Sequence, residues 1–251
     1  MIFCGDCLEI MDLLPDREVD MVLADVPYGT TQNAWDEPIP FAPMWEQLRR
    51  VTKVDGAIVL MAAQPFASRL VCSNLEDFRY DLIWSKNKAT GFLNAKKQPL
   101  RSHEHLLVFY RKPPVYTPQK TTGHRPANYA RKGRSSTNYG AQTVTEYGGS
   151  EERYPLSVVP MPIINNDDPE KSHPTQKPVD LMAWLIRTYT QPGETVLDFT
   201  AGSGTTAIAA LKEGRQYVCI ESDPTYAEIM RQRIARIGAP VSPSTRRHPC
   251  P

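Results

Sequence analysis

The chain has 251 residues, of which 41% are hydrophobic and 23% charged, so wholesale disorder is excluded. No apolar run approaches the ~20 residues of a membrane helix, residues 1–9 lack a basic signal-peptide start, and five scattered cysteines do not indicate a disulfide framework, so we expect a cytoplasmic protein. The net charge is only +1, yet residues 85–134 contain twelve Lys or Arg and one acid, Glu104, a pattern that suits nucleic acid better than a solvated loop.

The first half of the chain predicts strands that alternate with helices. Short apolar runs bounded by turn residues predict buried strands, and the amphipathic stretch Phe41–Val54 predicts a helix. The predicted strands are Val19–Ala24, Ala57–Ala62, Tyr80–Trp84 and Leu106–Tyr110. This alternation is typical of an α/β protein.

The second half begins with a change in amino-acid composition. Residues 112–168 are rich in Pro, Gly, Ser, Thr, Asn and Tyr without a helical or strand period, which predicts an inserted lobe or long ordered loops. Regular patterns then return and predict helix Pro178–Tyr189, strand Val196–Phe199, helix Thr205–Lys212, strand Tyr217–Ile220 and helix Pro224–Ile237. We therefore divide the chain into residues 1–111 and 173–237 as two halves of one α/β domain, residues 112–172 as an insertion, and residues 238–251 as a flexible tail.

A glycine-rich loop, Thr200–Thr206, joins the predicted strand at 196–199 to the next helix. Backbone N–H groups at such a helix start are typical of anion sites. Gly202 and Gly204 leave room for a ligand to approach the backbone, and Glu221 ends the next strand, where it can accept hydrogen bonds from a ribose diol. The pattern predicts a nucleoside cofactor, although by itself it also fits a nicotinamide-dependent oxidoreductase or a turn that only packs strand on helix.

The strand at 19–24 runs into Asp25-Val26-Pro27-Tyr28, and this motif makes the pattern specific. With a glycine-rich loop later in the chain, it resembles the β-class DNA amino-methyltransferases, whose catalytic tetrad is Asp-Pro-Pro-Tyr. Other stretches that resemble this family are Gly5–Glu9, Trp84–Lys86, Glu104–His105 and His173–Pro178. The resemblance covers residues 1–112 and 172–237, while the middle of the chain matches nothing in the family pattern.

The resemblance implies a Rossmann-like, S-adenosylmethionine-dependent methyltransferase sheet with an inserted DNA-recognition lobe. Its circular order would place the catalytic half before the cofactor half. An exocyclic amino nitrogen is a poor nucleophile because its lone pair is delocalised into the ring, so the site needs acceptors for both N–H groups. Asp25 and the backbone carbonyl of Val26 would accept them, Pro27 would keep Val26 extended, and Tyr28 would stack on a base rotated out of the duplex. Val26 replaces the first Pro of the family tetrad, and a carbonyl survives that change.

The resemblance also implies binding residues for the cofactor, while the excess of basic residues between residues 85 and 134 indicates binding residues for DNA. The S-adenosylmethionine pocket would be formed by Asp6, Cys7, Thr175, Lys177, Asp198, Phe199, Gly202, Gly204 and Glu221, with Thr175 and Lys177 near the methionine carboxylate. The residues expected to bind DNA are Lys86, Lys88, Lys96, Lys97, Arg125, Arg131, Lys132 and Arg134. We predict no metal site, because the Cys4–Cys7 pair has no second pair at zinc spacing.

The predicted function is site-specific methylation of double-stranded DNA at adenine N6. Within the family, Asp at the first tetrad position accompanies adenine more often than cytosine. An N4-cytosine methyltransferase and a catalytically decayed DNA-binding protein stay open as alternatives, whereas an oxidoreductase leaves Asp25–Tyr28 without a role. The family resemblance also leaves open a homodimer and a cognate restriction endonuclease.

Overall fold

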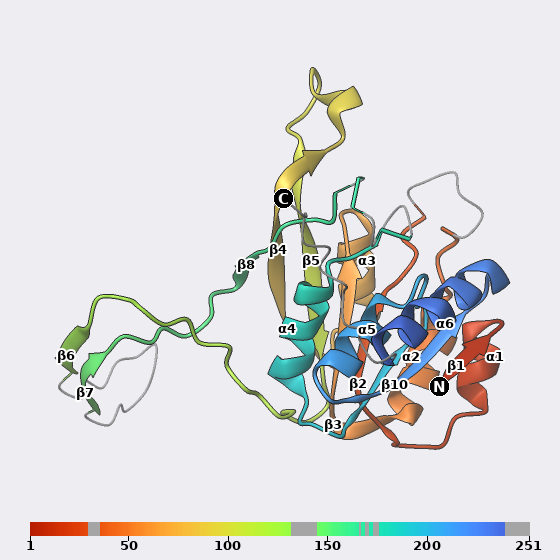
Figure 1. Cartoon of the computed structure of the whole chain (residues 1–251), viewed down its shortest axis with the longest axis horizontal. Coiled ribbons are helices and arrows are strands. Elements are labelled where there is room, and N and C mark those ends of the chain that lie inside the picture. The colour runs from red at the N-terminus through yellow and green to blue at the C-terminus, as the bar shows by residue number, and fades with distance from the viewer. Residues whose placement is uncertain (30–35, 132–144, 166, 169–170, 173–175, 239–251) are drawn as a thin grey trace, which may run out of the picture.

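The computed structural model describes residues 1–29, 36–131, 145–165, 167–168, 171–172 and 176–238, and for residues 127–131, 145–147 and 238 it describes the backbone alone. An eight-stranded sheet forms the body of the protein, in the order β1-β10-β9-β2-β3-β5-β4-β8, with helices on both sides (Figure 1). Its strands are β1 (Ile2–Cys4), β2 (Val19–Asp25), β3 (Thr52–Ala62), β4 (Phe78–Thr90), β5 (Arg101–Phe109), β8 (Val158–Pro160), β9 (Thr195–Asp198) and β10 (Gln216–Glu221). The helices are α1 (Cys7–Asp12), α2 (Phe41–Val51), α3 (Phe66–Ser73), the 3-10 turn η1 (Phe92–Asn94), α4 (Val179–Tyr189), α5 (Thr205–Lys212) and α6 (Pro224–Gly238).

The central strands are buried on both faces, which explains their nearly continuous apolar sequences. Along β3, Ile58, Leu60 and Ala62 join one core cluster and Ala57, Val59 and Met61 join the other. Helices α1, α2 and α3 contribute to the first cluster, while α4 and α5 contribute to the second. The result is a three-layer arrangement with the sheet in the middle.

Five neighbouring strands, from β1 through β10, β9 and β2 to β3, run parallel, and β5 follows antiparallel to β3. The carboxyl ends of the parallel strands therefore meet at one edge of the sheet. Strand β2 comes early in the chain and β9 late, yet they are adjacent in the centre, so the catalytic half precedes the cofactor half as predicted. The predicted Rossmann-like, circularly ordered fold is confirmed.

Several elements differ from the sequence prediction. The short β1, α1 and α3 were not predicted, because three to eight residues carry too little periodicity. Strand β4 continues to Thr90 and β5 starts at Arg101, because the polar residues there pair with each other beyond the apolar core. Helix α2 ends at Val51 rather than at residue 54, because Thr52 already begins β3.

Two elements of the predicted insertion leave the body of the molecule. Strands β6 (Ala127–Arg131) and β7 (Thr145–Ser150) form a separate antiparallel pair, set well apart from the main sheet in Figure 1. The returning chain adds β8 beside β4, parallel to it. Part of residues 112–172 thus belongs to the main sheet, and the division at these boundaries stays a prediction.

Candidate functional site

The predicted catalytic and cofactor segments meet at the carboxyl edge of the sheet. Asp25 is the last residue of β2, and the glycine-rich loop follows the adjacent β9. From this point the chain leads to helices on opposite faces, α2 after β2 and α5 after β9. In an open α/β sheet this divergence creates the crevice in which ligands bind.

Both carboxylate oxygens of Asp25 accept hydrogen bonds from side chains. Tyr28 Oη donates to Oδ1 at 2.7 Å and Lys177 Nζ donates to Oδ2 at 2.5 Å. The backbone carbonyl of Asp25 accepts from Thr200 Oγ1 at 3.1 Å, which ties the end of β2 to the loop after β9. Each oxygen of a carboxylate has a further lone pair, so Asp25 can still accept a hydrogen bond from a substrate.

Lys177 also joins Asp25 to a buried cluster of charges. Its Nζ lies 3.4 Å from Glu104 Oε2, and the other oxygen of Glu104 forms an ion pair with Lys86. The side chains of Lys177, Glu104 and Lys86 are 9%, 12% and 7% exposed. The cluster therefore balances two positive against two negative charges largely away from water.

The two pKa shifts in this cluster keep Lys177 and Glu104 charged. Burial by itself lowers the pKa of Lys177, but the negative charges of Asp25 and Glu104 outweigh it and leave that pKa raised. Burial raises the pKa of Glu104, but Lys177 and Lys86 together leave it lowered. Lys177 is thus a permanent cation beside Asp25 over the physiological pH range.

Tyr28 presents one face to the protein. Its ring stacks on Phe66 of α3, with centroids 5.5 Å apart and 29° between the planes. The N–H groups of Tyr28 and Gly29 donate to Asp36 Oδ1 at 2.8 and 3.0 Å, which ties the end of the motif to Asp36. Burial, followed by the charge of Asp25, holds the pKa of the Tyr28 hydroxyl well above its ordinary value, so the hydroxyl stays a donor.

The side chain of Val26 explains why an apolar residue occupies this position. It is 3% exposed and belongs to the core cluster on the α2 face of the sheet. Pro27 follows it and favours an extended conformation for Val26. The departure from the family tetrad is therefore accommodated by packing.

The glycine-rich loop is organised by two acids. Glu221 accepts from Gly202 N at 2.7 Å through Oε2 and from Asp223 N at 2.9 Å through Oε1. Asp198 is buried and accepts from Thr200 N at 3.1 Å and from Thr206 Oγ1 at 2.6 Å. Burial raises the pKa of Asp198 to about 7, while its two hydrogen bonds oppose this shift. Asp198 thus supports the loop from beneath.

Gly202 and Gly204 have different surroundings. Both have positive φ, +51° and +82°. A Cβ on Gly204 would overlap the side chain of Met230 in α6, whereas no described atom lies within 4 Å of a Cβ placed on Gly202. Gly204 therefore permits helix packing and a left-handed turn, and Gly202 borders open space where a ligand can approach the backbone.

Of the remaining predicted cofactor residues, Asp6 lies beside Glu221, Cys7 and Phe199 are more deeply buried, and Thr175 is not among the described residues. Asp6 lies next to Glu221, because Gly5 N donates to the Glu221 carbonyl at 3.0 Å, and it caps α1. Burial raises the pKa of the neighbouring Cys7 thiol to about 11, and Phe199 is a core residue at 1% exposure. The carboxylates of Asp6 and Glu221, beside the open space at Gly202, suit a nucleoside ligand.

The predicted DNA-binding residues are also divided by the structure. Lys86 was predicted to bind DNA, but its side chain is buried, ion-paired with Glu104 and 4.9 Å from the centroid of the Trp84 ring, so the structure places it within the charge cluster and not on the surface. Lys88 donates to Asn165 Oδ1 at 2.6 Å. Lys96, Lys97 and Arg125 are exposed. The Arg131 side chain, Lys132 and Arg134 lie outside the described part of the chain.

Sequence reasoning missed functional roles for several residues. Lys177 was expected near a cofactor carboxylate, and its contact with Asp25 was not foreseen. Glu104 was matched to the family without a role, although a single acid within a stretch of twelve cations is a signal that it is paired. No sequence pattern singles out Phe66 or Asp36, because their contacts with Tyr28 depend on the tertiary fold.

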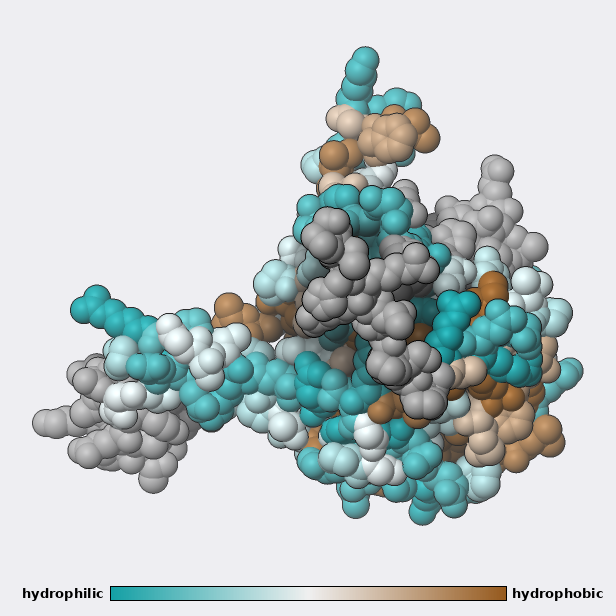
Figure 2. Space-filling view, in the orientation of Figure 1, coloured by the Kyte–Doolittle hydropathy of each residue, from teal (hydrophilic) through white to brown (hydrophobic). Residues whose placement is uncertain are grey.

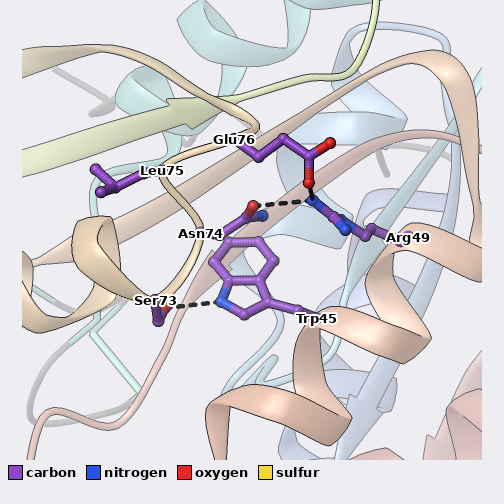
Figure 3. A pocket seen from close by; sticks show the side chains of 6 residues that line it. All are labelled: Trp45, Arg49, Ser73, Asn74, Leu75 and Glu76. Carbon is purple, nitrogen blue, oxygen red and sulfur yellow. Dashed lines mark hydrogen bonds and ion pairs between the residues drawn. The ribbon is translucent and has the colours of Figure 1, made fainter.

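A shallow pocket elsewhere offers no competing site. It lies near the start of β4, at the end of the sheet opposite Asp25, and is lined by Trp45, Arg49, Ser73, Asn74, Leu75 and Glu76 (Figure 3). Arg49 bonds to Glu76, Asn74 and Asp77, and Trp45 Nε1 donates to Ser73. These bonds fasten α2 to the loop before β4.

Across the described residues, no group of three or more His, Cys, Asp or Glu could hold a metal, and no helix could span a membrane.

Comparison with known proteins finds relatives among the DNA methyltransferases. Residues 19–232 match the family model for N6/N4-type DNA methylase. The DNA adenine methyltransferase YhdJ of Escherichia coli (strain K12) is 28% identical over 93% of this chain and 82% of its own. The crystal structure of the M1.HpyAVI–SAM complex is similar with a TM-score of 0.61 and 22% identity, covering 93% of this chain and 98% of that chain. The cytosine-N4-specific PvuII DNA methyltransferase is similar with a TM-score of 0.69 and 16% identity, over 92% and 85% of the two chains.

Proposed function

The chain belongs to the N6/N4 DNA methylase family, and from this membership we propose that it methylates the N6 amino group of adenine in double-stranded DNA. It is a DNA methyltransferase of the amino-methyltransferase type; the choice of adenine is the proposal. Two observations support adenine: the first tetrad residue is Asp25, and a curated relative is a DNA adenine methyltransferase.

The arrangement around Asp25 is the observation that supports methyl transfer to an exocyclic amino group. An exocyclic amino group becomes nucleophilic when its N–H groups are held by acceptors that favour a tetrahedral nitrogen. Asp25 offers carboxylate oxygens whose positions are fixed by Tyr28 Oη and Lys177 Nζ. Such preorganised acceptors stabilise the positive charge that develops on the amino nitrogen during transfer.

Lys177 and Glu104 act as positioning residues. The Lys177 ammonium holds one oxygen of Asp25, and Glu104 with Lys86 balances the charge of that ammonium. We assign to Asp25 the role of a hydrogen-bond acceptor for the amino group, and the methylated nitrogen then releases its proton to solvent water.

Glu221, Gly202 and Asp6 are the residues that fit the cofactor. S-adenosylmethionine supplies an electrophilic methyl group when it is bound. The Glu221 carboxylate is held by two backbone N–H groups at the end of β10, and its remaining lone pairs suit a ribose diol. The open space above Gly202 and the nearby Asp6 complete the same edge of the sheet.

N4-cytosine methylation is the second candidate function. The fold similarity to the cytosine-N4-specific PvuII enzyme favours it. The acceptors contributed by Asp25 and the Val26 carbonyl suit either amino group, because adenine N6 and cytosine N4 both carry two N–H donors.

Tritium transfer from S-adenosylmethionine to DNA tests the proposal. The purified chain is incubated with plasmid DNA from a methylation-deficient host, and the product is digested to nucleosides and separated. Label in N6-methyladenine is expected, whereas label in N4-methylcytosine selects the second candidate. DNA binding without incorporation contradicts both and favours a decayed DNA-binding protein. A cytoplasmic location, a homodimer and a partner endonuclease stay predictions from the family resemblance.

A further inference from the structure

One arm of the main sheet extends past the catalytic edge. Strand β5 pairs with β3 only through His105–Phe109, and His105 lies opposite Ala62, the last residue of β3. Residues 85–104 therefore continue beyond the sheet as a two-stranded hairpin closed by η1, which we call the projecting hairpin. Figure 1 shows it standing clear of the body, on the side where β2 and β3 end.

The tip of the projecting hairpin is apolar and exposed. Phe92 and Leu93 are 76% and 84% exposed, and Figure 2 shows hydrophobic surface at the end of the arm. Gly91, with φ +85°, turns the chain immediately before them. Adjacent large apolar side chains at the end of a narrow arm leave considerable apolar surface in water unless a partner covers it.

The charges beside this tip indicate nucleic acid as the partner. Lys88, Lys96, Lys97 and Arg101 flank the apolar pair, and no acid occurs between residues 86 and 103. This one-sided charge attracts phosphates and repels an identical hairpin of a second copy. An apolar pair flanked by cations is the combination with which proteins wedge between base steps while contacting the backbone.

The base of the hairpin is fastened to the catalytic carboxylate. Glu104 and Lys86, on its two strands, connect through Lys177 to Asp25. Trp84 Nε1 donates to the Met161 carbonyl at 2.8 Å, and β8 pairs with β4 at this level. Gly91 is six residue steps beyond Ser85, and the β4–β5 pairing shifts register between Ser85 and Thr90, so at ~3.3 Å per residue the tip reaches at most roughly 20 Å beyond the base, a span comparable to a DNA duplex.

We propose that Phe92 and Leu93 enter the base stack of the duplex and fill the space vacated by the target base; this inference rests on the proposed function. Extrusion of a base is unfavourable because it breaks pairing and stacking on both sides. The Phe92 ring restores stacking with a neighbouring base, and Leu93 excludes water from the gap. The charge cluster at the hairpin base keeps this wedge at a fixed distance from Asp25.

The test compares two synthetic duplexes. Sequencing of DNA methylated by the wild-type chain first identifies the target site. One duplex carries that site fully paired, and the other has an abasic position opposite the target base, so extrusion no longer breaks a base pair. Single-turnover methylation is measured for wild type, for Phe92→Ala/Leu93→Ala, and for Leu75→Ala, a control with an exposed apolar side chain near the opposite end of the sheet.

We expect Phe92→Ala/Leu93→Ala to slow methylation of the paired duplex by about 10- to 100-fold, the equivalent of one lost stacking contact. On the abasic duplex the variant should come within about threefold of wild type. Leu75→Ala should match wild type on both, and the melting temperatures should agree, because all three side chains are exposed. A second variant, Lys96→Gln/Lys97→Gln, should weaken binding to both duplexes alike.

Other outcomes overturn the inference in distinguishable ways. An equal loss on both duplexes means that the tip contributes to binding without assisting extrusion. Unchanged rates mean that it does not contact the DNA. Failure of the wild type to methylate any DNA contradicts the proposed function itself, and this inference with it.

Discussion

At the scale of single residues, Lys177 holds one carboxylate oxygen of Asp25. Lys177 forms ion pairs with two carboxylates, Asp25 and Glu104. Because its ammonium balances both of them, removing it leaves their negative charges poorly compensated. We predict that Lys177→Met lowers kcat by about ten-fold or more and changes the Kd for S-adenosylmethionine by less than about threefold. Single-turnover kinetics and calorimetry measure the two quantities.

Lys212→Met, on the exposed end of α5, is the matched control and should change neither quantity. The opposite pattern, a large rise in the Kd for S-adenosylmethionine with normal turnover, would show that Lys177 binds the methionine carboxylate instead. That pattern would restore the role expected from the sequence and remove the positioning role argued from the structure.

Tyr28 contributes both a ring and a hydroxyl, and two variants separate them. Tyr28→Phe retains the ring on Phe66 but loses the 2.7 Å hydrogen bond to Asp25, so kcat should fall while DNA affinity persists. Tyr28→Ala should also weaken the productive DNA complex by about 1–3 kcal/mol of lost base stacking. Identical kcat for Tyr28→Phe and wild type would show that the hydroxyl is dispensable.

Asp198 makes stability depend on pH. Its pKa is raised by burial to about 7 in the folded chain, against an unfolded value of 3.8, so the folded state binds a proton that the unfolded state releases. The stability that the folded chain gains by keeping Asp198 protonated is present below pH ~4 and is lost as the pH rises through about 7. We predict that Asp198→Asn gains melting temperature relative to wild type as the pH rises through this range.

Thermal denaturation without cofactor between pH ~5 and ~8 measures this difference. Glu228→Gln, exposed on α6, reports the general effect of removing one carboxylate. A melting difference between Asp198→Asn and wild type that does not change with pH would mean that Asp198 stays ionised in the folded chain.

At the scale of elements, the glycine-rich loop combines two different requirements for glycine. Gly204→Ala should destabilise the fold by roughly 1–3 kcal/mol, because its Cβ overlaps Met230. Gly202→Ala should reduce cofactor affinity with a loss of about 1 kcal/mol in stability, because its added methyl group enters open space and only the positive φ is unfavourable. Calorimetry measures the cofactor affinity of both variants, and thermal denaturation measures their stability. We expect the larger loss of affinity in Gly202→Ala and the larger loss of stability in Gly204→Ala, and equal losses of cofactor affinity would contradict this assignment.

The elements also show where sequence reasoning succeeded. Strand β2, β9 and β10 were predicted because apolar runs of four to seven residues end in turn residues, and Asp25 and Glu221 were placed from those ends. The projecting hairpin was not predicted. Its residues are polar and basic, so its strands are defined by pairing between β4 and β5 rather than by burial. For the same reason, Lys86 was predicted to bind DNA, although its side chain is buried in an ion pair with Glu104.

At the scale of the whole molecule, two distant parts of the chain build one site. Asp25 and Glu104 come from the first 111 residues, while Lys177 and the glycine-rich loop come after residue 172. The sequence allowed this assembly to be predicted, because parallel strands bring their carboxyl ends to one edge. The ion pairs across the site could not be predicted, because they depend on the path of loops between elements.

The most direct test is single-turnover methylation by Asp25 variants, with cofactor and DNA affinities measured alongside. Asp25 is assigned an interaction that is stronger in the transition state than in the ground state. We predict that Asp25→Ala and the isosteric Asp25→Asn lower the single-turnover rate by about 100-fold or more, with both affinities within about threefold of wild type. A rate equal to that of wild type in either variant would contradict the assignment of this edge of the sheet as the methyl-transfer site.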